Sequence, residues 1–207
     1  MAGSTLIDDP AHPGGTLIDG LGGEAGFGEG AVSRNDDGHS GFVDLTAVFE
    51  SGLTFFGQTF SGLYVNTNGS VTFAQPLASF TPFAITAGAT AGLFAFFADV
   101  DTSTGPASVS PGGTSTGANR VWYDVDATLD RVTITWDDVG YHSDGVDRTS
   151  AFQIILEDAS AQDRRAAGDF NIMFRYENVN WTTGDDSGGE GGLGGTVARA
   201  GWTAGVD

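Results

Sequence analysis

Short apolar runs separated by turn-forming residues make up most of this chain. The clearest run lies at positions 91–101, AGLFAFFADVD, where five large apolar side chains fall within eight positions and Asp99 and Asp101 flank the last of them. A short apolar run bounded by turn residues predicts a central strand that is covered on both faces. The run is too short to cross a bilayer, which takes about 20 apolar residues.

Two hairpins are predicted from strand patterns on either side of turn residues. Residues 63–67 and 70–73 flank an Asn-Gly pair, the strongest short-range hairpin signal. Residues 120–126 and 131–137 flank a second turn, and apolar and polar side chains alternate along the latter arm. Further strands are predicted at residues 42–49, 53–56, 151–156, 170–176 and 196–204. Because no stretch has convincing helical periodicity, the predicted fold class is all-β: an antiparallel β-sandwich with long Gly/Ser/Thr-rich loops and little or no helix.

Three segments lack a clear strand pattern. In residues 1–19 the tetrapeptide Thr-Leu-Ile-Asp occurs twice, with prolines and glycines between the two copies. We expect an extended arm, a pair of edge strands or a linker there. A single domain is expected over residues 20–207. Residues 102–119 form a loop rich in Ser, Thr, Gly and Pro, of a length that is often functional or mobile. Residues 184–195 contain seven glycines and predict irregular structure.

Charge narrows the choice of partners. The 207 residues include 27 Asp and Glu against eight basic residues, all of them Arg, for a formal net charge of −19. Such a surface repels nucleic acid and anionic membranes, so neither nucleic-acid binding nor membrane insertion is expected. It attracts divalent cations, although solubility alone explains the charge equally well.

The residue types that are missing exclude several chemistries. Without lysine there is no Schiff-base catalysis and no phosphate loop of the kind that needs its lysine. Without cysteine there are no disulfides, thiolate nucleophiles or zinc–thiolate sites. The first ten residues lack the basic and apolar regions of a Sec signal peptide, so export would need another route or a leader outside this chain.

No catalytic residue is assigned. Residues 186–189 resemble part of the GDSGG segment of chymotrypsin-like proteases, but a serine nucleophile needs a histidine base that is oriented by an acid. None of His12, His39 and His142 lies in a matching context, and His142 is expected in a loop. Carboxylate pairs suited to a glycosidase arise by chance among so many acids.

Calcium is the one cofactor that the sequence raises, since it binds hard oxygen ligands from Asp, Asn and backbone carbonyls. Asp99 and Asp101 begin like a calcium loop, although the next glycine arrives one residue late. Asn35, Asp36 and Asp37 offer three adjacent oxygen donors. These five residues are the candidate metal ligands. Turn formation, in which Asp and Asn bind their own backbone, is the simpler explanation for each cluster.

Several blocks of the sequence resemble, in order, the nidogen-like (NIDO) domain family. The blocks are residues 55–73 (FFGQTFSGLYVNTNGSVTF), 96–102 (FFADVDT), 121–123, 135–140, 170–181 and 194–201. The similarity covers about residues 20–207, and the segment at 26–38 is similar to bacterial members. The resemblance implies an extracellular interaction module, because the family occurs in animal matrix and cell-surface proteins and in bacterial secreted or surface proteins. It supplies no catalytic residue.

We therefore expect a non-enzymatic adhesion or structural module of a bacterial surface or secreted protein, with a protein or glycan partner at the cell surface or matrix. Two alternatives stay open. One is a calcium- or glycan-binding recognition module. The other is a self-assembling subunit whose N-terminal arm adds a strand to an exposed sheet edge of a neighbouring copy.

Overall fold

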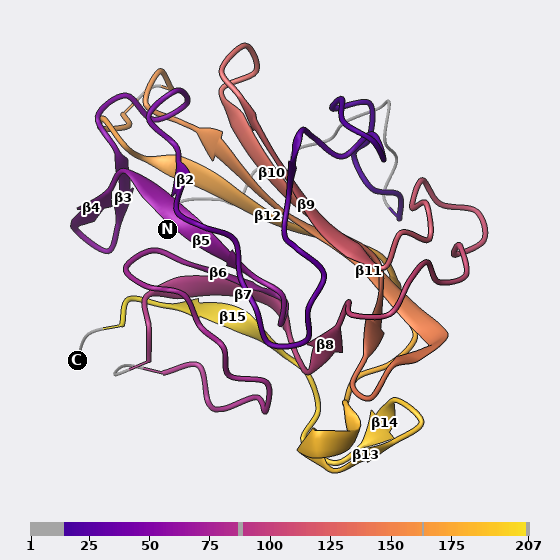
Figure 1. The fold of residues 1–207 in the computed structure, drawn as a ribbon. Helices are drawn as coiled ribbons and strands as arrows, with labels where there is room; N and C mark the ends of the chain where they lie inside the picture. The colour runs from indigo at the N-terminus through magenta and orange to yellow at the C-terminus, as the bar shows by residue number, and fades with distance from the viewer. Residues whose placement is uncertain (1–14, 87–88, 163, 206–207) are drawn as a thin grey trace.

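Two antiparallel sheets pack face to face in the computed structural model, which describes residues 15–86, 89–162 and 164–205 (Figure 1). The first sheet has the order β1-β9-β10-β11-β12, with β8 also paired to β10, and the second has the order β15-β7-β6-β5-β2. The predicted all-β sandwich is confirmed. No helix in the described part of the chain has the length and apolar character needed to cross a membrane.

The strands of the first sheet are β1 (Gly30–Ala31), β8 (Val100–Asp101), β9 (Arg120–Asp126), β10 (Arg131–Tyr141), β11 (Gly145–Asp158) and β12 (Phe170–Val179). Those of the second sheet are β2 (Val43–Asp44), β5 (Gly62–Asn66), β6 (Ser70–Thr72), β7 (Gly92–Phe97) and β15 (Arg199–Thr203). Two short hairpins complete the fold: β3 (Leu53–Phe55) with β4 (Gln58–Phe60), and β13 (Gly189–Glu190) with β14 (Leu193–Gly194). A 3-10 turn, η1, covers Asp185–Ser187.

Both predicted hairpins form. The β5–β6 hairpin pairs Asn66 with Ser70 across the Asn-Gly turn, and the β9–β10 hairpin pairs Asp126 with Arg131. Gly69 is required in the first turn because its φ is +75° and a Cβ would lie 1.8 Å from the carbonyl oxygen of Phe96. That close approach brings the turn against β7, and the sequence signal for a hairpin therefore also marks a packing contact.

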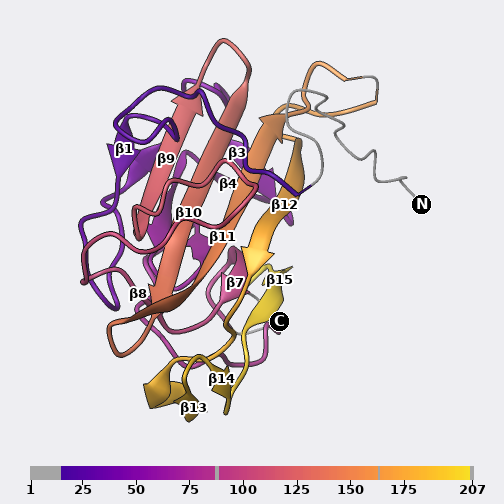
Figure 2. The same cartoon turned by 90° about the vertical axis from the view of Figure 1, so that its right-hand side faces the viewer.

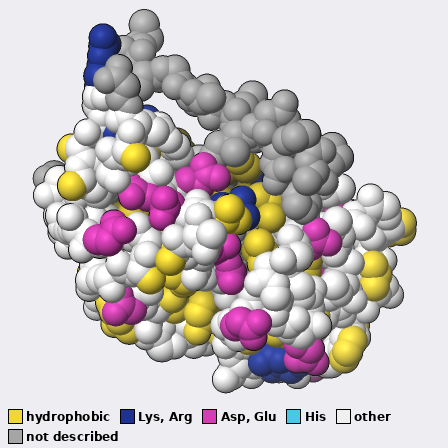
Figure 3. All heavy atoms as spheres, turned by 90° about the horizontal axis from the view of Figure 1, so that it is seen from above, with side chains coloured by type: hydrophobic (Ala, Val, Ile, Leu, Met, Phe, Trp, Pro, Cys, Tyr) yellow, Lys and Arg dark blue, Asp and Glu magenta, His cyan; other side chains and the backbone are white. Residues whose placement is uncertain are grey.

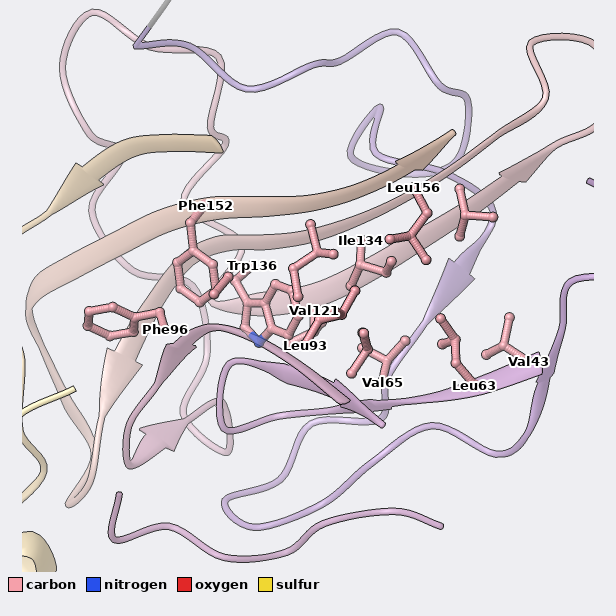
Figure 4. Close-up of a cluster of buried hydrophobic side chains, with 14 of the residues drawn as sticks. Val43, Leu63, Val65, Leu93, Phe96, Val121, Ile134, Trp136, Phe152 and Leu156 are labelled. Atoms are coloured by element: carbon pink, nitrogen blue, oxygen red, sulfur yellow. The ribbon is translucent and has the colours of Figure 1, made fainter. Parts of the chain in front are cut away.

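The core lies between the two sheets (Figure 4). Ile134 and Trp136 of β10 point toward the second sheet, as the alternation in residues 131–137 predicts, and pack with Val65 and Leu93. Trp136 also stacks on Phe152 with ring centroids 4.8 Å apart. Its indole N–H donates to the carbonyl of Thr67 at 2.8 Å, so one side chain both fills the core and bonds the two layers together.

The apolar run at 91–101 is covered on both faces as predicted, but it is not one strand. All six residues of β7 are buried: Phe96 contacts Trp181 in the core between the sheets, whereas Phe97 contacts Phe83 on the opposite side. The chain then turns at Asp99, where the N–H of Val100 donates to the carbonyl of Ala98 at 3.0 Å, and β8 joins the other sheet. This turn carries the chain from one layer to the next.

Two local predictions are wrong. Only Val43–Asp44 of the predicted 42–49 strand is extended, because the Asp44 carboxylate accepts the N–H and hydroxyl of Thr46 and starts a turn. Residues 184–195 are not irregular throughout, since they form η1 and the β13–β14 hairpin. Five of their seven glycines, among them Gly188 and Gly192, adopt positive φ and allow these tight reversals.

The predicted arm is partly docked on its own domain. Residues 1–14 lie outside the described residues, but Leu17 and Ile18 are buried on the outer face of the first sheet, the face that Figure 2 presents. The N–H and carbonyl of Ile18 bond the side-chain amide of Gln153 on β11 at 2.8 and 2.7 Å. The division at residue 19 stays a prediction.

Candidate functional site

Four chain segments meet where the chain passes from β7 to β8. They are the turn at residues 35–38, the turn around Asp99, the β10–β11 turn at His142, and η1. Here Asp36, Asp37 and Asp99 each offer one carboxylate oxygen, and these three oxygens lie within 4.8 Å of one another. The structure thus brings together three of the five residues that the sequence suggests as metal ligands.

The turn at residues 35–38 places two of these acids. The side-chain oxygen of Asn35 accepts the N–H of Gly38 and, at 2.8 Å, the hydroxyl of Thr67. The backbone carbonyl of Asn35 accepts the N–H of Thr102 at 2.9 Å. Asn35 therefore closes the turn with its side chain and leaves Asp36 and Asp37 facing Asp99.

Asn68, from the β5–β6 turn, holds one acid in position. Its side-chain N–H donates to the carboxylate of Asp37 at 2.8 Å, and its side-chain oxygen accepts the N–H of Val100 at 2.8 Å. One amide thus connects Asp37 to the first residue of β8. The sequence marks Asn68 only as a turn residue, and nothing local shows this second role.

Asp99 is 1% exposed, and its Oδ2 has no hydrogen-bond partner among the described residues. The same holds for Oδ1 of Asp36. Burial, with a further contribution from neighbouring acids, raises the pKa of Asp99 to about 7 and that of Asp36 to about 6. Gly184 lies directly against Asp99, since a Cβ there would be 2.5 Å from its Oδ2.

His142 is the basic side chain that faces the cluster. Its Nε2 lies 3.8 Å from Oδ2 of Asp36, and its Nδ1 lies 4.0 Å from Oδ1 of Asp186. Burial lowers the pKa of His142, but the carboxylates of Asp36, Asp99 and Asp186 raise it more, so it stands above its ordinary value. The sequence prediction of a loop position is confirmed, yet no sequence signal pointed to this contact.

Asp101 lies apart from the cluster in its bonding. One of its oxygens accepts the N–H and hydroxyl of Ser103, and the other accepts the N–H of Asp144 at 3.1 Å. Both oxygens are therefore used to close turns, as the turn-formation alternative describes. Two acids separated by a single residue thus have different environments.

A second group of buried acids, Asp137 and Asp138, lies at a bulge in β10. Asp137 accepts the N–H and the hydroxyl of Thr116. Asp138 accepts the hydroxyl of Ser110 at 2.6 Å and the N–H of Gly117 at 2.9 Å. These bonds fasten the long loop at residues 102–119 to the sheet, so this part of the loop is tied down.

The donor set of the first cluster suits a hard cation. Three carboxylates offer oxygen ligands, which calcium prefers, and among the ion pairs of the described residues only His142 faces them. No described thiolate or lysine competes, because the chain contains neither residue type. The alternatives for this geometry are therefore an oxygen-bound divalent cation or protonation of one or more acids.

Comparison with known proteins shows which family this chain is similar to. A family model described as "Nidogen-like domain" matches residues 61–207. Alpha-tectorin of Homo sapiens is 31% identical over 189 residues, covering 82% of this chain and 8% of that protein, and alpha-tectorin of Mus musculus is 32% identical over 186 residues with the same coverage. The chicken protein (Gallus gallus) is 29% identical over 187 residues. The chain thus spans about 8% of the length of these relatives, and no solved structure matches it.

Proposed function

Because this chain belongs to the nidogen-like domain family, we propose that it is a non-enzymatic adhesion or structural module that works outside the cell. The observation that carries this proposal is the family match over residues 61–207, together with alpha-tectorin relatives that share about a third of their aligned positions. Alignment with a small part of much larger relatives fits a module. The bacterial surface or secreted setting rests on the resemblance at residues 26–38.

The geometry around Ser187 supports a non-enzymatic role. In the segment that resembles a protease motif, the Ser187 hydroxyl is buried and lies 3.0 Å from the hydroxyl of Thr81. In that segment the His142 ring forms an ion pair with Asp186, with Nδ1 lying 4.0 Å from Oδ1. A serine hydroxyl that bonds a threonine lacks the adjacent base that would activate it as a nucleophile.

The surface offers a partner both charge and apolar contacts. On the face in Figure 3, acidic side chains are dispersed among hydrophobic and uncharged ones. Trp202, on the edge strand β15, is 57% exposed, and Phe56, in the β3–β4 turn, is 62% exposed. Exposed aromatic side chains are common anchors in protein and glycan recognition, and a strand at a sheet edge has unpaired backbone groups.

Localisation tests the first half of the proposal. Antibody raised against this domain is expected to label intact source cells or their medium, and protease added outside intact cells should remove the signal. A cytoplasmic marker probed in the same cells controls for lysis. Signal that appears only after the cells are broken would contradict an extracellular module.

Competition tests the second half. Purified domain should reduce attachment of the source cells to their surface or to one another by several-fold, because it occupies the partner. Trp202→Ala should weaken this inhibition, whereas Leu129→Ala, an equally exposed apolar side chain in the β9–β10 turn of the other sheet, serves as the matched control. If wild-type domain at saturating concentration leaves attachment unchanged, adhesion is not its role.

A further inference from the structure

We propose that Asp36, Asp37 and Asp99 bind one calcium ion at the crossing from β7 to β8 and that this ion locks the crossing in place. The inference goes beyond the proposed adhesion role and does not depend on it, because the ion would bind within the domain itself. It rests on three features of the described residues: a buried acid without a donor, the spacing of the carboxylates, and the failure of turn formation to explain them.

The first feature is the unpaired carboxylate of Asp99. An acid that is 1% exposed has lost nearly all contact with water, and Oδ2 of Asp99 gains no protein donor in return. Oδ1 of Asp36 is also buried without a hydrogen-bond partner, although the Asp36 side chain as a whole is partly exposed. Buried charges in proteins are paired or coordinate metals, because an uncompensated buried charge is strongly unfavourable.

The second feature is the spacing. Oxygens that bind calcium lie about 2.4 Å from the ion, so two ligands of one ion can be at most about 4.8 Å apart. The three acids meet this limit, since each offers one carboxylate oxygen and these three oxygens lie within 4.8 Å of one another. A magnesium ion, with ligands about 2.1 Å away, requires a smaller cage of about 4.2 Å across.

The third feature separates these acids from the turn-forming acids of the same chain. Four aspartates elsewhere accept the backbone N–H of the residue two positions later: Asp44, Asp101, Asp126 and Asp158. Each of those is followed at that position by Ser or Thr. The buried oxygens of Asp99 and Asp36 accept no such bond, so turn formation does not explain why these residues are acids.

His142 does not replace the ion. Its ring nitrogen lies 3.8 Å from Asp36, beyond hydrogen-bond distance, and its side chain is partly exposed. One imidazolium could neutralise one of three carboxylates at most. His142 therefore lies at the rim of the site, while Asn68 acts as a positioning residue that orients Asp37 toward the ion.

The ion would connect segments that are far apart in the sequence. Asp36 and Asp37 come from the turn between β1 and β2, whereas Asp99 forms the turn between the two sheets. Binding them together fixes the path of the chain from β7 into β8. Calcium should therefore stabilise the folded domain, since the acids are not held together in the unfolded chain.

Thermal unfolding with calcium chloride tests the proposal. After dialysis against EDTA and removal of the chelator, the wild-type domain should melt roughly 5 °C higher in 10 mM CaCl2 than without it, for a dissociation constant of about 10⁻⁴ to 10⁻³ M. Isothermal titration should show about one ion per chain. Absence of both binding heat and a shift overturns the proposal, and so does an equal or larger shift with MgCl2.

Asp99→Asn is the decisive variant because it removes the charge and keeps the shape. It should fold at least as stably as wild type without calcium, and its calcium shift should fall below a fifth of the wild-type value. Asp36→Asn provides a second variant with the same expected loss. The double variant Glu24→Gln/Glu50→Gln is the matched control: both side chains are exposed, and its calcium shift should be unchanged.

Two outcomes would overturn the assignment to this site. A calcium shift of wild-type size in both Asp99→Asn and Asp36→Asn would place binding elsewhere. If the Glu24→Gln/Glu50→Gln control also lost the calcium shift, calcium would be acting by general screening of the −19 net charge and not by binding at this site. Because neither measurement involves a partner, failure here leaves the adhesion proposal standing, and failure of adhesion leaves the ion site standing.

Discussion

Two groups of acids with buried carboxylate oxygens differ in what surrounds those oxygens. Asp137 and Asp138 are fully buried at the bulge in β10, and N–H and O–H donors of the 102–119 loop reach the carboxylates of both. Asp36 and Asp99 lie at the crossing between the sheets, where each keeps a buried oxygen without a donor. Protein donors therefore reach the carboxylates of the first group, whereas the second group keeps carboxylate oxygens that no described donor reaches.

The difference teaches that burial alone does not identify a cation site. Burial raises the pKa of Asp137, but the bonds from Thr116 oppose that rise and stabilise the ionised form. Around Asp99 the neighbours include Asp36, Asp37 and Asp186, which repel its charge. The first group therefore fastens the loop through protein donors alone. In the second group, the uncompensated carboxylates favour binding of a cation.

The largest effect is expected from changing Asp138, which fastens the 102–119 loop to the sheet. Asp138→Asn replaces an accepting oxygen with a donor in front of Ser110 or Gly117, so it should lower the free energy of unfolding by about 2–3 kcal/mol, as measured by urea denaturation. Its calcium shift should stay at the wild-type value. Destabilisation by Asp99→Asn as large as that by Asp138→Asn, without calcium, would erase the distinction between the two groups.

The second effect concerns pH in the metal-free protein. With a pKa of about 7 in the folded state against an ordinary 3.8, Asp99 binds a proton on folding between these values. The free energy of unfolding in EDTA should therefore rise as pH falls from 8 to 5, on the order of 2 kcal/mol. Asp99→Asn should reduce this slope more than Asp137→Asn, because burial also raises the pKa of Asp137 but the bonds from Thr116 oppose that rise. A slope retained in full in Asp99→Asn would assign it to Asp36 and His142, whose pKa values are also raised.

A smaller effect is expected from removing a loop hydroxyl that bonds Asp137. Thr116→Val removes the hydroxyl that donates to Asp137 but keeps the backbone N–H bond, so it should cost about 1.5 kcal/mol in urea denaturation. Thr114→Val, which removes a neighbouring hydroxyl directed at the carbonyl of Leu17, is the matched control for loss of a loop hydroxyl. Equal calcium affinity in Thr116→Val and wild type is also expected.

The smallest effect concerns Asn68, which positions Asp37 in the proposed calcium site. Asn68→Ala frees Asp37 from its positioning bond and should weaken calcium binding about tenfold, equivalent to about 1.4 kcal/mol, in isothermal titration. It also removes the acceptor for the N–H of Val100, so some loss of stability without calcium is expected. Asn66→Ala, in the adjacent strand, is the control. Unchanged calcium affinity in Asn68→Ala would show that Asp37 needs no such support.

Most of the fold followed from local patterns. The Asn-Gly turn and the alternation along residues 131–137 predicted hairpins that form, because turn geometry and the two-residue period of a strand act over a few neighbouring residues. The 42–49 prediction was wrong because Asp44 bonds Thr46 and ends the strand, a competition that alternation alone does not reveal. The docking of Leu17 and Ile18 on the first sheet was equally invisible in the sequence.

What the sequence by itself determined is the class of fold, the family and a set of candidate acids. Only the tertiary structure decided which acids gather: Asp99 faces Asp36 and Asp37, while Asp101, two positions on, bonds Ser103. It also decided that the apolar run divides between two sheets, with Asp99 at the crossing. The physical reason is that local bonding settles turns and strands, whereas a site built from residues far apart in the chain exists only once the two layers have packed.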